Sequence, residues 1–303
     1  MVECFEMDLE LIDQIGDDRP SSLEDEYKDE NSDSLQTDQF SVVGASVRGK
    51  LHIRSETHYH RDDAFRGYYD GTWLVVAVAD GTGSRDLSRY GAAYSVNAFC
   101  TAVMGSLHNE NGRTLDEKDW LKETVLQAFK DARADLEQFS SQHERKPEDL
   151  HCTLLGMALN TITGEAVVGQ IGDGLILGLH DNREARPLVE PPNPGEVGVS
   201  YFLTQSNWED YLRIETVTGE ETSRILTYYL MTDGVADDCQ YGPPEDILKR
   251  WANDMDREIR LSSTASIEEA AGKLKIYLNT YQAQGSFDDR TLVIIYRKEN
   301  TTG

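Results

Sequence analysis

At positions 73–83 the chain reads WLVVAVADGTG, in which an apolar run ends at an aspartate followed by two closely spaced glycines. The unbroken apolar run is typical of a buried β-strand, and Asp80-Gly81 marks the turn where the chain leaves the sheet. Two other segments have a similar design: residues 228–232 run into Asp233-Gly234, and Asp288-Asp289 leads into residues 292–296. Carboxylates are therefore predicted at the ends of three strands.

A fourth acidic pair, Asp62-Asp63, lies upstream of these strands. Any one pair alone is explained most simply as a solvated turn. Four pairs, three of them attached to rigid strand ends, indicate a shared site, because magnesium and manganese prefer carboxylate, carbonyl and water oxygens to imidazole or thiolate. The sequence therefore predicts an oxygen-rich site in which bound divalent cations offset the repulsion between aspartates.

These pairs belong to a longer ordered series of motifs. The series comprises Gly44-Ala45-Ser46, Arg61-Asp62-Asp63-Ala64, residues 78–84, Gly91-Ala92-Ala93, residues 152–156, residues 169–174, residues 231–235 and Asp288-Asp289-Arg290-Thr291. A single Asp-Gly-x-Gly is a weak signal, whereas the whole series in this order is specific. Over about residues 41–298, the chain resembles the metal-dependent serine/threonine protein phosphatases of the 2C type, most closely their bacterial branch.

The resemblance implies a metal-binding role for five positions. Asp80 matches the aspartate that bridges two metal ions, and the backbone carbonyl of Gly81 matches a ligand of the second ion. Asp233 and Asp288 match the aspartates that hold the first ion. Asp62 matches an acidic residue that serves the second ion directly or through water. The expected cofactors are two Mn²⁺ or Mg²⁺ ions, with a third ion as an option.

Three further aspartates have less direct roles in the resemblance. Asp63 would orient metal-bound waters. Asp173 matches an aspartate associated with a weaker third metal, although a hairpin turn between two strands explains the Gly172-Asp173-Gly174 sequence equally well. Asp289 stands where the family usually has asparagine, and it is expected to support the ligands rather than to bind metal.

The implied chemistry is hydrolysis of phosphoserine and phosphothreonine in proteins. Two metal ions about 3.5–4 Å apart acidify a bridging water into hydroxide and neutralise the phosphate oxygens during in-line displacement. That chemistry needs no protein nucleophile. Consistently, the chain lacks Gly-x-Ser-x-Gly, Walker-type and Cys-x5-Arg arrangements.

Two positions depart from the better-known eukaryotic pattern. Thr82 stands where that branch carries a histidine suited to general-acid catalysis, and His58 occupies the position of the phosphate-clamping arginine. Arg54 and Arg61 are close enough in sequence to replace it, because a guanidinium binds phosphate through two parallel hydrogen bonds, and Arg61 is the candidate clamp. His58 or His60 is the candidate proton donor. The spacing of His52, His58 and His60 does not match the usual zinc-ligand patterns, so polar loop residues are the simpler interpretation.

Helix signals come in two pairs. Residues 86–107 and 116–140 are expected to form long helices, the second with an apolar stripe. Pro243-Pro244 is expected to open a helix through Trp251, and a capping box formed by Ser266 and Glu269 is expected to start another. Strands between two helix pairs predict an α+β fold.

Strands are expected at residues 152–159, 166–171, 175–179 and 199–203. The short links at residues 163–164 and 173–174 predict antiparallel hairpins. The resemblance extends this to a four-layer α-β-β-α sandwich of two antiparallel sheets flanked by helix pairs, with the metals at one edge. Residues 187–210 resemble a variable loop beside the site, which either selects substrate or is a plain surface connection.

Composition divides the chain into three parts. With 303 residues and 39% hydrophobic content, the chain has enough apolar material for one large domain. Residues 1–40 contain fourteen acidic and two basic residues, so they are predicted to be a flexible acidic extension that cannot fold alone. Residues 41–298 are the expected catalytic domain, and residues 299–303 are the expected C-terminal tail.

The formal net charge of −26 predicts repulsion from nucleic acid and from anionic membranes. No apolar run approaches the length of a transmembrane helix. The four cysteines show no paired spacing, which favours a reducing cytoplasm. The expected partners are a phosphoprotein substrate and a cognate serine/threonine kinase.

Two other functions remain open at this point. Thr82 and the missing clamp arginine are compatible with a phosphatase-like regulatory module that recognises phosphoproteins without turning them over. The acidic residues 1–40 are compatible with a scaffold that docks a basic partner.

Overall fold

Two antiparallel six-stranded sheets form the centre of the computed structural model, which describes residues 2–6, 29–50, 60–108, 117–190, 200–240, 247–281 and 287–298. The first sheet contains, in spatial order, β1 (Glu3–Glu6), β4 (Ala64–Tyr69), β5 (Trp73–Ala79), β6 (Leu154–Asn160), β7 (Ala166–Ile171) and β10 (Arg213–Val217). The second contains β2 (Glu30–Gln36), β3 (Phe40–Val47), β12 (Arg290–Arg297), β11 (Ile225–Met231), β8 (Leu175–His180) and β9 (Ala185–Pro187).

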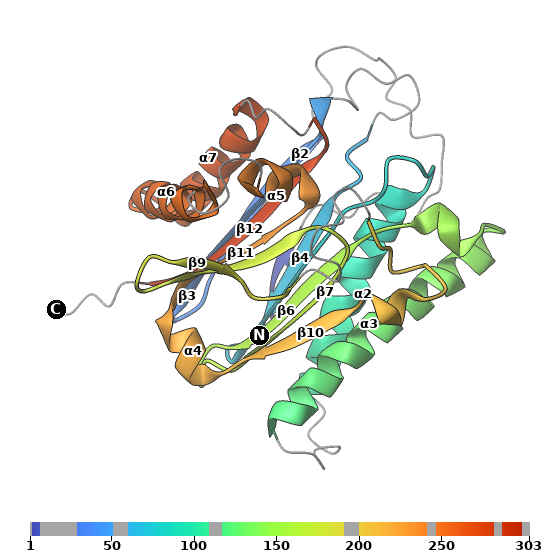
Figure 1. Cartoon of the computed structure of the whole chain (residues 1–303), viewed down its shortest axis with the longest axis horizontal. Helices are drawn as coiled ribbons and strands as arrows, with labels where there is room; N and C mark the ends of the chain where they lie inside the picture. The colour runs from blue at the N-terminus through green and yellow to red at the C-terminus, as the bar shows by residue number, and fades with distance from the viewer. Residues whose placement is uncertain are drawn as a thin grey trace.

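Helices cover the outer face of each sheet (Figure 1). The first sheet is covered by α2 (Ser88–His108) and α3 (Glu117–Gln142), and the second by α6 (Ile247–Ser262) and α7 (Ile267–Thr280). Within the described ranges, the shorter helices are α4 (Gly219–Arg224) and α5 (Asp233–Gln240), and 3₁₀ turns span Pro147–Leu150 and Trp208–Asp210. This arrangement confirms the predicted α+β sandwich of two sheets between helix pairs. Among the described helices, none has both the length and the hydrophobicity needed to cross a bilayer.

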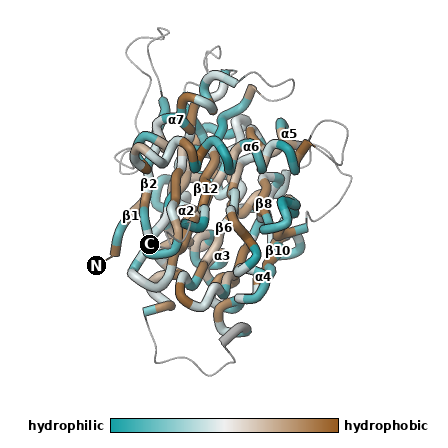
Figure 2. Tube along the Cα trace, turned by 90° about the vertical axis from the view of Figure 1, so that its left-hand side faces the viewer, coloured by the Kyte–Doolittle hydropathy of each residue, from teal (hydrophilic) through white to brown (hydrophobic). Residues whose placement is uncertain are grey.

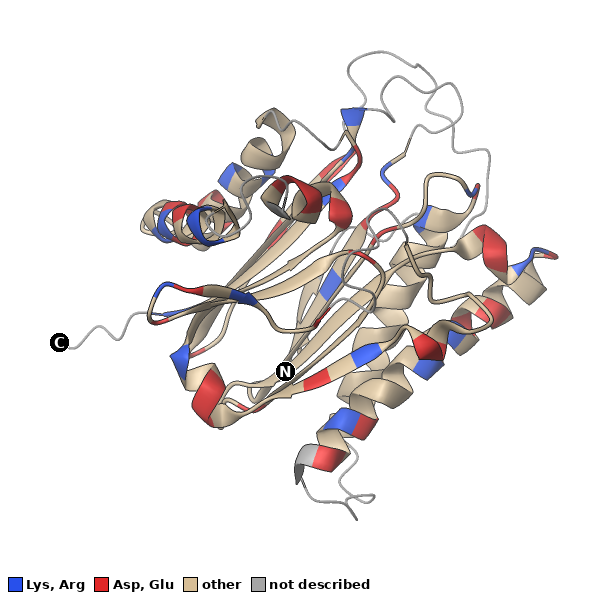
Figure 3. Ribbon diagram, viewed as in Figure 1, with Lys and Arg blue, Asp and Glu red and all other residues tan. Residues whose placement is uncertain are grey.

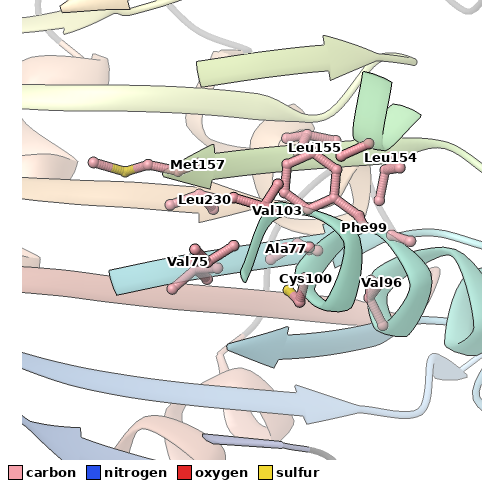
Figure 4. Packing of buried hydrophobic residues seen from close by; sticks show 14 of the residues in the cluster. Val75, Ala77, Val96, Phe99, Cys100, Val103, Leu154, Leu155, Met157 and Leu230 are labelled. Atoms are coloured by element: carbon pink, nitrogen blue, oxygen red, sulfur yellow. The ribbon is translucent and has the colours of Figure 1, made fainter. Parts of the chain in front are cut away.

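The core lies between the layers, where hydrophobic segments of the strands and helices meet (Figure 2). On the first sheet, the helix α2 packs the side chains of Val96, Phe99 and Val103 onto β5 and β6 (Figure 4). Gly156 on β6 makes room for the Phe99 ring, because a Cβ atom there would lie 2.3 Å from it. The strands are buried on both faces, which explains why they read as continuous apolar runs in the sequence.

Most predicted elements agree with the structure to within a few residues. The two long helices appear as α2 and α3, and the capping box is present, with the Ser266 hydroxyl accepting a hydrogen bond from the Glu269 amide at 3.0 Å. The helix α6 extends beyond Trp251 to Ser262, while Pro243-Pro244 lies outside the described residues.

The strand predicted at residues 199–203 is wrong for the part that the structure describes. Residues 200–203 have no regular secondary structure. The Leu203 amide donates to the Cys152 carbonyl at 2.9 Å, and the Arg133 guanidinium donates to the Leu203 carbonyl at 2.7 Å. The Arg133 side chain therefore occupies the Leu203 carbonyl, which a neighbouring strand would otherwise have bonded.

The link at residues 173–174 is not a hairpin. The strand β7 pairs in the first sheet and β8 in the second, so Gly172-Asp173-Gly174 carries the chain from one sheet to the other. The Gln170 amide group holds this crossover by donating to the carbonyls of Gly172 and Gly174, at 3.2 and 2.7 Å. In contrast, Thr163-Gly164 does join the paired strands β6 and β7, as predicted.

The sequence prediction also needs correction at two strands of the acidic extension. The strand β1 pairs with β4, and β2 pairs with β3, so each sheet has an edge strand from residues 1–40. The side chain of Phe5 is fully buried, with its ring centroid 5.1 Å from that of Phe65. Cβ atoms at Gly44 and Gly67 would lie 2.5 and 3.2 Å from the Phe5 ring, so the two glycines form its pocket. The extension has too few apolar residues to fold alone, but β1 and β2 pair with strands of the main domain and pack against its core.

We predict that Phe5→Ala lowers the free energy of unfolding by about 3–5 kcal/mol, because the substitution empties a pocket between the two sheets. Urea denaturation followed by circular dichroism measures the loss. Val2→Ala is the matched control, since Val2 is 48% exposed. Equal unfolding midpoints for Phe5→Ala and the unmodified protein would show that β1 does not contribute to the fold.

Candidate metal centre

The predicted acidic positions gather at one end of the sandwich, the end where α5 begins (Figure 3). Asp80 directly follows β5, Asp288 lies two residues before β12, and Asp63 directly precedes β4. Asp233 directly follows Thr232 after β11 and is the first residue of α5. Asp173 lies in the crossover from β7 to β8. Five separate segments of the chain thus supply one acidic cluster.

Electrostatics show that these carboxyl groups are close neighbours. Desolvation, followed by the negative charges of Asp233, Asp63 and Asp288, raises the pKa of Asp80 well above its ordinary value. The pKa of Asp233 is raised to about 8 by desolvation and then by Asp173 and Asp288. The cluster therefore carries more negative charge than the surrounding protein neutralises.

Asp63 is the most buried member, with 1% of its surface exposed. Its Oδ2 atom accepts a hydrogen bond from the Thr232 hydroxyl at 2.8 Å, and the same hydroxyl accepts one from the Thr291 amide at 3.1 Å. Thr232 thereby links the end of β11 to the start of β12 and to Asp63. Burial, and then the charge of Asp289, raises the pKa of Asp63 to about 7.

Asp289 connects several backbone segments of the site. Its two carboxylate oxygens accept hydrogen bonds from the amides of Gly49 and Asp62, each at 2.5 Å. Its own amide donates to the Asp288 carboxylate at 2.9 Å. These bonds fix the loop that carries Asp62. Both carboxylate oxygens of Asp289 are used, one for the Gly49 amide and one for the Asp62 amide.

Glycine is required in two of the acidic motifs because other backbone groups approach closely. A Cβ atom at Gly234 would lie 1.9 Å from the carbonyl oxygen of Asp289. One at Gly81 would lie 2.5 Å from the carbonyl of Ser88, where α2 begins. The Gly81 amide also donates to the Asp62 carbonyl at 3.2 Å. The Asp-Gly pairs thus bring the segments together, rather than serving as surface turns.

The donor set fits a hard divalent cation. The Oδ1 atoms of Asp63 and Asp173 are buried and have no hydrogen-bond partner among the described residues, and the second oxygen of Asp173 accepts a hydrogen bond from Ser200. Buried carboxylate oxygens with no donor are suitable ligands for magnesium or manganese. Within the described ranges, no three His, Cys, Asp or Glu side chains form a closed metal-ligand group. The carboxylates would therefore have to draw together around a bound cation.

The structure gives the buried side chain of Arg61 a carboxylate partner. Its side chain is 6% exposed, and its guanidinium lies 3.3 Å from the Asp29 carboxylate and donates to the Ser46 carbonyl at 2.9 Å. The backbone amide of Arg61 donates to the same Asp29 carboxylate at 2.9 Å. Arg61 thus anchors the start of β2 to the main domain, and its role as a phosphate clamp stays a prediction. His58 and His52 lie outside the described residues.

The sequence analysis missed Asp237, which lies one helical turn after Asp233 on α5. Desolvation, followed by the charges of Asp173, Asp238 and Asp288, raises its pKa to about 6. The signal was the four-residue spacing from Asp233, which places both side chains on one helix face. The sequence predicted a turn at Asp233-Gly234, so the four-residue helical spacing to Asp237 was not recognised.

The chain matches one protein family by its sequence profile. The family profile described as Protein phosphatase 2C matches residues 48–274. No curated protein shows significant sequence similarity to the chain.

Among solved structures, the chain is similar to serine-threonine phosphatase 2C from Toxoplasma gondii, with a TM-score of 0.56 and 14% identity, over 88% of this chain and 99% of that one. It is also similar to the Mycobacterium tuberculosis serine/threonine phosphatase PstP, with a TM-score of 0.52 and 15% identity, over 86% of this chain and 100% of that one. A further structure of the PstP catalytic domain contains 2 manganese ions and has a TM-score of 0.51 at 16% identity, over 86% of this chain and 99% of that one.

We predict that the metal-free protein loses stability as the pH rises. The folded state retains protons on Asp63 and Asp233 that unfolded carboxyl groups release near pH 4, so the stabilisation is complete below pH 4 and is lost as the pH passes about 7 and about 8. Each titrating carboxyl contributes a slope of up to about 1.4 kcal/mol per pH unit. Urea denaturation in chelator at pH 5 and pH 8 measures the difference.

The matched pair for this experiment is Asp233→Asn, which should flatten the pH dependence, and Asp119→Asn at the exposed start of α3, which should not. Higher stability at pH 8 than at pH 5 in the unmodified, metal-free protein would contradict the assignment of mutually repelling carboxylates.

Proposed function

This chain belongs to the protein phosphatase 2C family, and we propose that it hydrolyses phosphoserine and phosphothreonine in proteins with the help of two divalent metal ions. The observation that supports the proposal best is the convergence of Asp63, Asp80, Asp233 and Asp288 from distant parts of the sequence. Buried carboxylates that repel one another lower the stability of the fold, and a bound cation would neutralise their charge.

Each aspartate has a proposed role. Asp80 would hold both ions, and Asp233 and Asp288 the first ion. Asp62 and the carbonyl of Gly81 would serve the second ion. When bound, two Mn²⁺ or Mg²⁺ ions would supply a bridging hydroxide as nucleophile and neutralise the phosphate oxygens.

Two more carboxylates would complete the site. Asp63, held by the Thr232 hydroxyl, would orient the attacking water through its unpartnered Oδ1 atom. Asp173 would serve a third ion, since its Oδ1 atom is also buried without a donor within the described residues. The proposed partners are a phosphoprotein substrate and the serine/threonine kinase that phosphorylates it.

The buried ion pair of Arg61 favours one alternative, a module that recognises phosphoproteins without turnover. If Arg61 stays paired with Asp29, the substrate phosphate has to be bound by other groups. Binding of a phosphothreonine peptide in saturating manganese, with no release of phosphate, would support the alternative.

We predict that Asp80→Asn and Asp233→Asn each abolish manganese-dependent hydrolysis of p-nitrophenyl phosphate and of a phosphothreonine peptide, with losses of at least about 100-fold, because each removes an anionic metal ligand. Both variants should remain folded, since a neutral amide relieves repulsion in the cluster. Asp119→Asn is the control, because Asp119 is exposed at the start of α3. Full activity in Asp80→Asn would contradict the proposed function.

A further inference from the structure

A short ladder continues β5 and β6 past their ends and places His151 two positions along the strand pair from Asp80. The Thr153 amide donates to the Asp80 carbonyl at 2.8 Å, and the Thr82 amide donates to the His151 carbonyl at 3.1 Å. Gly81 and Cys152 form an isolated antiparallel bridge between these bonds. The register therefore places Asp80 opposite Thr153, and Thr82 opposite His151.

Two contacts show which way the side chains of this ladder point. The Cys152 thiol lies 3.7 Å from the Ser95 hydroxyl on α2, and a Cβ atom at Gly81 would meet the Ser88 carbonyl at the start of α2. The central pair thus faces α2. Because successive side chains on a strand alternate, Asp80 and His151 project from the opposite face. They are separated by about 7 Å along the strand direction, the rise of two residues.

The His151 ring is held in one orientation by the segment that follows the variable loop. Its Nδ1 atom lies 2.6 Å from the Thr204 hydroxyl, and the ring stacks on Phe202 with a centroid distance of 4.9 Å and an interplanar angle of 13°. The ring is half-buried, and none of the described residues forms a hydrogen bond with its Nε2 atom. The ring thus has one fixed nitrogen and one that can donate to a substrate.

A serine or threonine alkoxide is a poor leaving group, so its departure from phosphate is assisted by a proton donor. We propose that His151 is this donor, an inference that rests on the proposed phosphatase function. As the water-derived nucleophile bonds to phosphorus, the bond from phosphorus to the serine oxygen breaks and its electron pair stays on that oxygen. The oxygen then takes the proton from Nε2 of the imidazolium, which becomes neutral imidazole and regains a proton from water.

The surroundings of His151 set the expected pH dependence. Burial, followed by the positive charge of Arg85, lowers the pKa of His151, while Glu148 and Asp149 of the preceding 3₁₀ turn act in the opposite direction. Phe202 and Thr204, which contact the ring from the other side, carry no charge. A lower pKa makes the imidazolium a stronger but less abundant acid, so its contribution should decrease as the pH rises from 6.

The test compares two leaving groups in the same manganese-loaded protein. A p-nitrophenolate ion is stable enough to leave without a proton, whereas a serine oxygen needs a proton to leave. His151→Asn should lower turnover of a phosphoserine peptide about 100-fold or more and leave p-nitrophenyl phosphate turnover nearly unchanged. In the unmodified protein, the ratio of phosphoserine to p-nitrophenyl phosphate turnover should fall as the pH rises from 6 to 9, and in His151→Asn it should be flat.

His108→Gln is the matched control, since His108 lies at the far end of α2 and pairs with Asp70. Thr204→Val, which removes the Nδ1 partner, should lower phosphoserine turnover less than His151→Asn does. If His151→Asn leaves the protein folded and lowers the turnover of both substrates equally, or of neither, His151 is not the proton donor. A selective loss in His58→Gln instead would also overturn the proposal. Unmodified protein that hydrolyses neither substrate would contradict the proposed function itself, and this inference with it.

Discussion

Mutual repulsion between aspartates at one end of the sandwich is the constraint on which the rest of the site depends. Without cations, the folded chain tolerates them because hydroxyls and amides bind some of their oxygens and because several retain protons. Thr232 and Asp289 contribute most, since they tie together the ends of β11 and β12, the start of β4 and the loop at Gly49. The same contacts hold the remaining oxygens in place for a cation.

The sandwich provides this geometry because all of its strands are antiparallel and the chain crosses between sheets at the site. Asp173 lies at that crossover, and Gly234 allows α5 to approach the backbone of Asp289. The β5–β6 ladder then extends the site outward to Thr82 and His151, beyond the carboxylates. In this arrangement Asp80 and a titratable imidazole lie on one face of a single strand pair, which suits hydrolysis of an ester with a poor leaving group.

Local sequence patterns predicted the fold class, the helix pairs and the gathering of Asp80, Asp233 and Asp288, because apolar runs that end in carboxylates are local signals. Features that depend on distant partners were not predictable in this way. The Asp29 partner of Arg61 lies 32 residues upstream in an acidic segment, and the burial of Phe5 depends on glycines of two other strands. The Gly172-Asp173-Gly174 sequence is equally compatible with a hairpin or a crossover, since only the pairing of β7 and β8 distinguishes them. Likewise, nothing in the sequence places His151 opposite Thr82.

If the acidic cluster is a cation site, its carboxylates give up protons when the metal binds. Calorimetric titration of the metal-free protein with Mn²⁺ at pH 7, in two buffers with different ionisation enthalpies, measures both binding and the number of protons released. We expect saturable binding with net proton release, because Asp233 and Asp80 have raised pKa values that a bound cation lowers. Absence of binding, or binding without proton release, would contradict it.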